Sequence, residues 1–109
     1  MELQQNNGSL TVKLSGDLDH HKADEIRAEL DEAIDECRPR CLIFDLHGVT
    51  FMDSSGVGII MGRYKKVTAM GGSVCFVGVN NCIDKLVKMS GLLRIIPEIK
   101  ETEPLTQSG

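Results

Sequence analysis

Hydroxyl and carboxyl side chains stand together in the middle of the chain. The run Asp53-Ser54-Ser55-Gly56 falls where an apolar, extended segment gives way to a helical pattern. A Ser or Asp at such a place commonly caps the helix, because its side chain accepts hydrogen bonds from free amides of the first turn. A cap needs one such residue, whereas three stand in a row here. The run therefore favours a function in addition to capping.

The helix that follows this run contains two glycines, Gly58 and Gly62. Each costs roughly 1 kcal/mol relative to Ala in an exposed helix interior. They are four residues apart and so share one face, which is bare enough for another backbone to come close. Ile59 is next to that face and is predicted to be an apolar anchor for a partner. The pattern indicates a docking surface.

A catalytic serine is the main alternative for Ser54. The strand-serine-helix order resembles a nucleophile elbow, but that motif needs glycine at position 52, which is Met52. A triad also needs a base, and the sequence places none of His20, His21 and His47 beside Ser54. The sequence thus predicts a protein that is not an enzyme.

The sequence predicts no metal or cofactor. Adjacent His20 and His21 point in different directions and make a poor chelating pair. The cysteines do not have zinc-site spacing and are expected to be reduced thiols without disulfides; they are Cys37, Cys41, Cys75 and Cys82. No glycine-rich nucleotide loop is present.

Hydrophobic periodicity predicts alternating strands and helices in the order β-β-α-β-α-β-α-β. Period-2 alternation and continuous apolar runs predict strands, and apolar stripes at helical spacing predict helices. The expected strands are 2–6, 10–14, 41–46 and 73–79, with 49–52 extended and 95–99 either a last strand or a short extended edge. The expected helices run from Asp19 to near Arg38, from 53–56 to Gly71-Gly72, and from Asn80 or Asn81 to Gly91.

Turns and helix faces complete this prediction. Asn6-Asn7-Gly8 is expected to close a hairpin, 15–17 to break the second strand, and His47-Gly48 to form a turn. The acidic face of the first helix is expected to be solvated. The core-facing residues of the second helix are expected to be Val57, Ile60, Met61, Tyr64 and Val67. The order favours one layered α/β domain over residues 1–109, in which 101–109 form a disordered tail.

Length and charge narrow the classes of partner. The chain has 109 residues and a net charge of -4, without a basic run, so neither nucleic acid nor an anionic membrane is an expected partner. The N-terminus lacks the features of a secretory signal, and no stretch of about 18 apolar residues could span a bilayer. A cytoplasmic location is predicted.

Three motifs together resemble those of a known family. They are residues 16–21 (Gly-Asp-Leu-Asp-His-His), residues 51–58 (Phe-Met-Asp-Ser-Ser-Gly-Val-Gly) and residues 89–92 (Met-Ser-Gly-Leu). In this order they are similar to the STAS-domain anti-sigma factor antagonists, most of all to the sporulation sigma F type. The likeness covers roughly residues 3–100, and it implies a small mixed β-sheet flanked by α-helices.

The resemblance also implies a mechanism. Unphosphorylated members bind an anti-sigma factor that is also a serine kinase, and this frees the sigma factor. The kinase then phosphorylates the first serine of the motif, here Ser54 (Ser55 is its neighbouring rival), and a serine phosphatase resets the switch. A general-stress sigma antagonist or another STAS scaffold subunit is the alternative, and a monomer is expected. The predicted partner-binding residues are Asp19, Asp53, Ser54, Ser55, Gly56, Gly58, Ile59 and Gly62.

Overall fold

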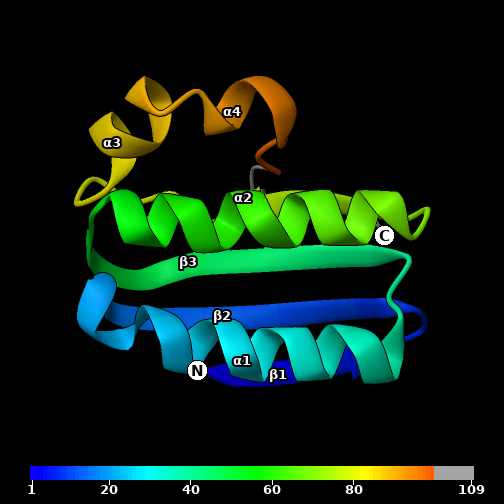
Figure 1. Cartoon of the computed structure of the whole chain (residues 1–109). Coiled ribbons are helices and arrows are strands. Elements are labelled where there is room, and N and C mark those ends of the chain that lie inside the picture. The colour runs from blue at the N-terminus through cyan, green and yellow to red at the C-terminus, as the bar shows by residue number, and fades with distance from the viewer. Residues whose placement is uncertain (100–109) are drawn as a thin grey trace.

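The computed structural model describes residues 1–99, which form one mixed sheet with helices on one side (Figure 1). The elements follow one another as β1 (Glu2–Asn6), β2 (Ser9–Leu18), α1 (His20–Cys37), β3 (Cys41–Met52), α2 (Ser54–Ala69), β4 (Ser73–Val77), α3 (Asp84–Met89) and α4 (Leu92–Ile95). The strand order is β1-β2-β3-β4; β1 is antiparallel to β2, and the other two pairs are parallel. The predicted layered α/β domain with a small mixed sheet is confirmed.

The β1–β2 hairpin forms as the sequence predicts. Asn6 pairs with Ser9, and the two residues between them have positive φ angles, 51° at Asn7 and 88° at Gly8. Two residues with positive φ give the tight turn whose twist matches that of the flanking strands, and Asn-Gly tolerates it best.

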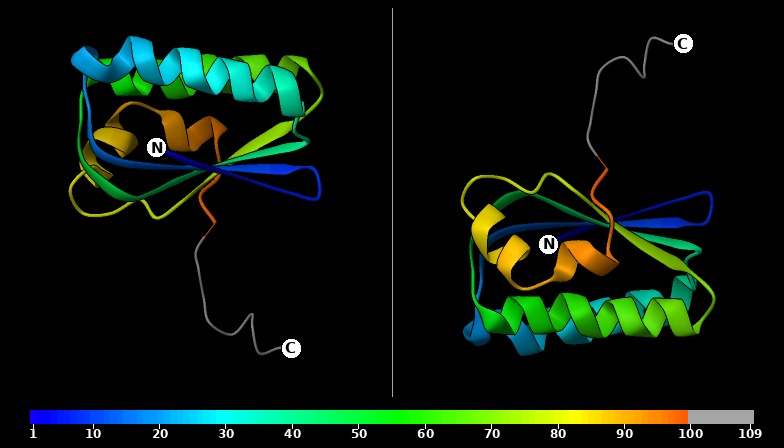
Figure 2. Two further views of the ribbon diagram at one scale, coloured as in Figure 1. Left: turned by 90° about the horizontal axis from the view of Figure 1, so that it is seen from below. Right: turned by 90° about the horizontal axis from the view of Figure 1, so that it is seen from above.

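The core lies between the sheet and the helices. Figure 2 shows α1 and α2 side by side over one face of the sheet, with α3 and α4 beside α2 on the same side. Alternate residues of the central strands face this layer and are buried, among them Leu42, Phe44 and Leu46 of β3. Helix α1 packs on β2, and α2 packs on β3 and β4, so the buried side chains of β3 lie near the centre of the core.

Both central strands are longer than predicted. Neither 15–17 nor His47-Gly48 ends a strand. The pairing of β2 with β3 continues past both, with a shift in register at two places. Five positions separate Lys13 from Leu18, whereas seven separate their partners Asp45 and Met52. The extra residues of β3 are accommodated without breaking the sheet.

The C-terminal part differs from the prediction in two details. The residue that caps α3 is Ile83, without a side-chain hydrogen bond, rather than Asn80 or Asn81. Ile95 ends α4, and 97–99 form the short extended edge: Phe76 N donates to the Pro97 carbonyl, and Ile99 N donates to that of Phe76. The predicted disordered tail, 101–109, lies outside the described residues.

The acidic face of α1 is not simply solvated. Arg63 of α2 lies with its Nε 3.0 Å from Asp31 Oδ1, and Lys66 Nζ lies 3.0 Å from Asp35 Oδ1 and 3.6 Å from Asp31 Oδ1. The hydrogen bond to Asp35 is the largest of the effects that raise the pKa of Lys66 above its usual 10.5. Part of the acidic face therefore joins the two helices through ion pairs.

Candidate functional site

Two helices begin at the same edge of the sheet. The parallel strands β2 and β3 end opposite one another, with Leu18 paired to Met52, and Asp53 N donates to the Leu18 carbonyl at 3.4 Å. The next residues, Asp19 and Asp53, are the N-caps of α1 and α2. The strand ends thus place both helix starts together (Figure 1).

The carboxylates of Asp19 and Asp53 cap their helices in the same way. Asp53 Oδ1 accepts from the amides of Ser55 at 2.8 Å and Gly56 at 3.4 Å. Asp19 Oδ1 accepts from the amides of His21 at 3.0 Å and Lys22 at 3.3 Å. Since Asp53 satisfies these donors, neither serine hydroxyl is needed for capping.

Ser54 is the exposed hydroxyl of the motif. It is the first residue of α2, whereas Ser55 is half-buried. Within residues 1–99 neither hydroxyl has a hydrogen-bond partner. An anionic group on Ser54 would lie at the positive end of the helix dipole, where negative charge is stabilised.

Gly56 serves packing and is not open to a partner. It is buried, and a Cβ there would lie 2.6 Å from Met52 Cγ and 2.8 Å from the Leu18 carbonyl oxygen. The absence of a side chain lets α2 begin close against both strand ends. The prediction that Gly56 contacts a partner is therefore wrong, because the residue faces the interior.

Gly58 and Gly62 leave the outer side of α2 bare. A Cβ on either glycine would meet no atom within 4 Å outside its own helix. Gly58 is exposed and Gly62 is half-buried. Together with Asp19, Asp53 and Ser54 they make up what we call the helix-mouth surface; its binding role stays a prediction.

Ile59 was predicted to be a partner anchor, and this is wrong because its side chain is 1% exposed. The core-facing stripe of α2 is centred on Ile59, Ile60 and Val67, and the predicted Val57, Met61 and Tyr64 are half-buried beside it. Ile59 shares a side of α2 with Arg63 and Lys66, which pair with α1, so that side is covered as well as the side toward the sheet.

The histidines do not form a catalytic arrangement with Ser54. The rings of His20 and His21 contact each other, with centroids 4.0 Å apart. His47 Nδ1 lies 2.7 Å from Asp45 Oδ1. Within the described part of the chain, none of the three is hydrogen-bonded to Ser54, and no group of three or more His, Cys, Asp or Glu side chains could hold a metal ion.

The four cysteines are free. Burial raises the pKa of the Cys75 thiol to about 11, and the nearby Cys41 thiol adds to this effect. Cys75 is therefore protonated at neutral pH and a poor nucleophile.

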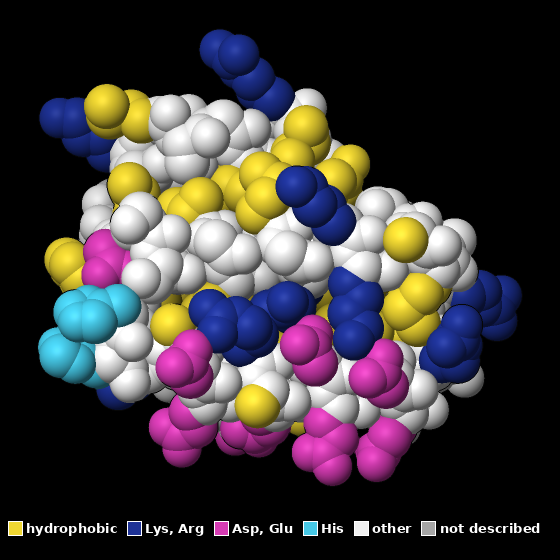
Figure 3. Space-filling view, viewed as in Figure 1, with side chains coloured by type: hydrophobic (Ala, Val, Ile, Leu, Met, Phe, Trp, Pro, Cys, Tyr) yellow, Lys and Arg dark blue, Asp and Glu magenta, His cyan; other side chains and the backbone are white. Residues whose placement is uncertain are grey.

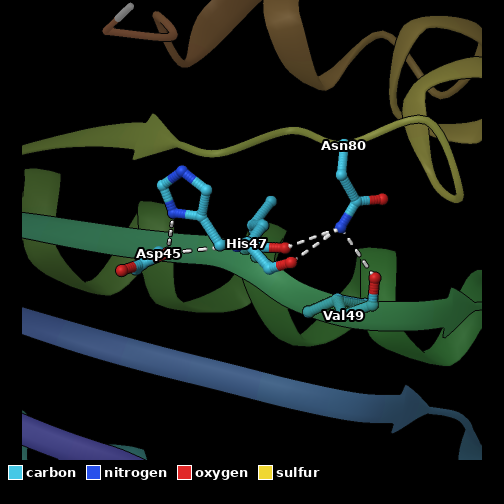
Figure 4. A network of polar contacts seen from close by, with 5 residues as sticks. Asp45, His47, Val49 and Asn80 are labelled. Carbon is cyan, nitrogen blue, oxygen red and sulfur yellow. Dashed lines mark hydrogen bonds and ion pairs between the residues drawn. The ribbon is translucent and has the colours of Figure 1, made fainter. Parts of the chain in front are cut away.

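Asn80 is a positioning residue that sequence reasoning missed. Its Nδ2 donates to three carbonyls of β3, those of Leu46 at 3.1 Å, His47 at 3.1 Å and Val49 at 2.9 Å (Figure 4). Its Oδ1 accepts from Cys82 N at 2.8 Å. The side chain thus holds the irregular part of β3, which leads to the helix-mouth surface. An Asn after a strand predicts a helix cap equally well, so the local sequence does not reveal this role.

Comparisons with known proteins define the class. The STAS domain family matches residues 1–105. This chain therefore belongs to the STAS domain family. In the part of the chain that the structure describes, no helix combines the length and the apolar character needed to cross a membrane.

Particular relatives narrow the resemblance. The chain is 42% identical over 97 residues to an anti-sigma F factor antagonist of Paenibacillus polymyxa. The matched region covers 89% of this chain and 83% of that protein. The solved structure of the anti-sigma factor antagonist SpoIIAA in its unphosphorylated form superposes with a TM-score of 0.80 at 29% identity, covering 98% of this chain and 92% of that one. The Bacillus cell fate determinant SpoIIAA in its phosphorylated form gives 0.73 at 29% identity, covering 98% and 96%. The predicted resemblance to sporulation anti-sigma factor antagonists is confirmed.

Proposed function

We propose that this chain is an anti-anti-sigma factor whose unphosphorylated form binds an anti-sigma factor with serine kinase activity. Binding releases a sporulation sigma factor, phosphorylation of Ser54 by the kinase ends binding, and a serine phosphatase restores it. The observation that carries the proposal is the exposed Ser54 hydroxyl at the start of a helix that Asp53 already caps. The chain itself acts in the cytoplasm as a monomer without enzymatic activity.

The function of two kinds of relative supports this proposal. The Paenibacillus polymyxa relative is an anti-sigma F factor antagonist, and SpoIIAA has been solved in unphosphorylated and phosphorylated forms. In this chain the exposed hydroxyl is the one to which the family resemblance assigns the phosphate. The bare outer side of α2 beside it supplies room for a docking protein.

Charge explains how such a switch would work. A phosphoserine adds roughly -1.5 to -2 charges at neutral pH. The free end of α2 tolerates that charge, so the fold survives. A partner that covers Ser54 must instead desolvate it beside the Asp53 carboxylate. A penalty of about 3 to 4 kcal/mol weakens binding roughly 10²- to 10³-fold.

Substitution of Ser54 tests the proposal. We expect Ser54→Asp to weaken binding to the kinase by at least about 10²-fold in calorimetry, with an unchanged circular dichroism spectrum. Ser54→Ala should bind but accept no phosphate, and Ser55→Ala, the matched control, should bind and gain a single phosphate in intact-mass spectrometry. Tight binding by Ser54→Asp, or a phosphate gained by Ser54→Ala, would contradict the proposal.

A further inference from the structure

The motif at residues 89–92 builds a rigid corner between α3 and α4. Ser90 Oγ donates to the Val87 carbonyl at 2.8 Å and accepts from Leu92 N at 3.2 Å. Gly91 has a φ of 83°, and Leu92 is buried. Ser90, Gly91 and Leu92 are thus held by contacts within the corner, whereas Met89 projects from it and is 76% exposed.

The corner lies at the edge of the sheet where α2 begins. Strand β4 is parallel to β3, so its carboxyl end leads out at the same edge as Met52. Figures 1 and 2 both show α3 at the end of the molecule where α1 and α2 start. Asn80, in the connection from β4 to α3, is hydrogen-bonded to β3. The corner is therefore held in a fixed position relative to Ser54.

The charge around Met89 differs from that of the acidic face of α1. Lys85 and Lys88 are exposed on α3 beside it, and Lys88 Nζ lies 3.1 Å from Asp84 Oδ2. The whole chain, in contrast, has a net charge of -4. In Figure 3, a few basic side chains and an apolar one lie over α3, a row of basic side chains lies along α2, and acidic side chains gather over α1. The corner is thus a basic surface with one apolar projection.

We propose that Lys85, Lys88 and Met89, which we call the α3 corner, bind the same kinase that docks at the helix-mouth surface. This inference rests on the proposed function. Met89 enters an apolar pocket of the kinase, and carboxylates around that pocket face the two lysines. Methionine is flexible and polarisable, so it fills irregular pockets, and a few such anchors dominate binding energy in protein interfaces.

Contact at two places changes what phosphorylation can do. A phosphate on Ser54 disrupts the helix-mouth surface, but the α3 corner keeps its contacts. The corner therefore contributes to recognition before and during phosphate transfer without touching the reacting atoms. Its loss should raise the KM for this chain as a kinase substrate and leave kcat unchanged.

The test compares Met89 of α3 with an exposed apolar residue of the edge strand β1. Met89→Ser should weaken binding to the kinase at least tenfold and raise KM by a similar factor at constant kcat. Met89→Leu should bind within about threefold of wild type, because it restores an apolar side chain of similar volume. The double variant Lys85→Glu/Lys88→Glu should weaken binding and flatten its salt dependence. Leu3→Ser, at a partly exposed apolar position on the edge strand β1, should change nothing.

The possible failures are distinct. Wild-type binding by Met89→Ser, alongside lost binding by Ser54→Asp, would overturn the α3 corner and leave the proposed function standing. A concentration-dependent dimer that Met89→Ser abolishes would show that a second copy occupies the corner, and would overturn the inference too. A wild-type chain that neither binds the kinase nor accepts phosphate would overturn both.

Discussion

The starts of α1 and α2 are built alike, yet the two helices differ in everything that follows. Each begins after a parallel strand, and each is capped by an aspartate that accepts two backbone amides. After Asp19, α1 continues for 18 residues without a glycine. After Asp53, α2 continues with two serines and with glycines that leave its outer side bare. Capping therefore explains the architecture, and the proposed function depends on what differs beyond the cap.

Filling the bare side of α2 should have the largest effect on binding. We expect Gly58→Leu to weaken kinase binding about 10²-fold, roughly 2.7 kcal/mol. The new side chain would hold the backbone of α2 away from the backbone of the docked kinase. The same substitution should raise stability by about 0.5 kcal/mol, since glycine is a poor helix former and the Cβ meets no atom. Calorimetry and urea denaturation measure the two effects.

Ala28→Leu is the matched control on α1, where Ala28 is exposed. We expect it to change neither binding nor stability by more than about 0.5 kcal/mol. Equal losses of binding in the two variants would show that the bare side of α2 has no special role.

Substitution of the buried Gly56 of α2 should lower stability, whereas substitution of the exposed Gly58 should raise it. Gly56→Ala would place a Cβ against Met52 and the Leu18 backbone, so we expect a loss of about 2 kcal/mol in the free energy of unfolding. Gly58→Ala, two residues away, should gain about 0.5 kcal/mol. If urea denaturation showed both variants to be equally stable, the close approach of α2 to the strand ends would be disproved.

Removal of the caps should reveal the likeness between the two helix starts. We expect Asp19→Ala and Asp53→Ala each to cost about 1 kcal/mol in the free energy of unfolding, and Asn at either position to retain most of the cap. The midpoint of urea denaturation measures both. A large difference between the two Ala variants would show that one carboxylate has a structural role beyond capping.

The ion pairs that join the two helices give the smallest expected effect. Lys66→Met should cost about 0.5 kcal/mol at neutral pH, whereas Lys65→Met, at an exposed position next to it, should be neutral. The pKa of Lys66 is raised in the folded state, so its contribution is present below pH 10.5 and is lost as the pH rises further. Denaturation of both variants at pH 7 and pH 12 checks this; a difference that persists at pH 12 would contradict the ionic origin.

Local signals in the sequence were sufficient for much of the fold. The Asn-Gly turn, the alternation in β2 and the capping motif before α2 depend on neighbouring residues, and each appears in the structure as predicted. The openness at Gly58 and Gly62 also follows from residue type and helical spacing.

The failures have a common origin in contacts distant along the chain. Ile59 is buried on the side of α2 that faces α1, the side that also carries Arg63 and Lys66, and the periodicity of one helix does not show where a neighbouring helix lies. The strands continue through Gly16 and Gly48 because the ladder between them tolerates irregular pairing. Asn80 holds carbonyls more than 30 residues earlier in the chain, which no local pattern predicts.

The two additional residues of β3 act as a spacer that sets how far Ser54 projects. A strand advances about 3.3 Å per residue, so without them the second helix would begin roughly 7 Å out of line with the first. Removing only one would also turn the following side chains to the opposite face of the sheet. The position of the Ser54 hydroxyl along the strand direction is thus determined by strand length, far from the helix that displays it.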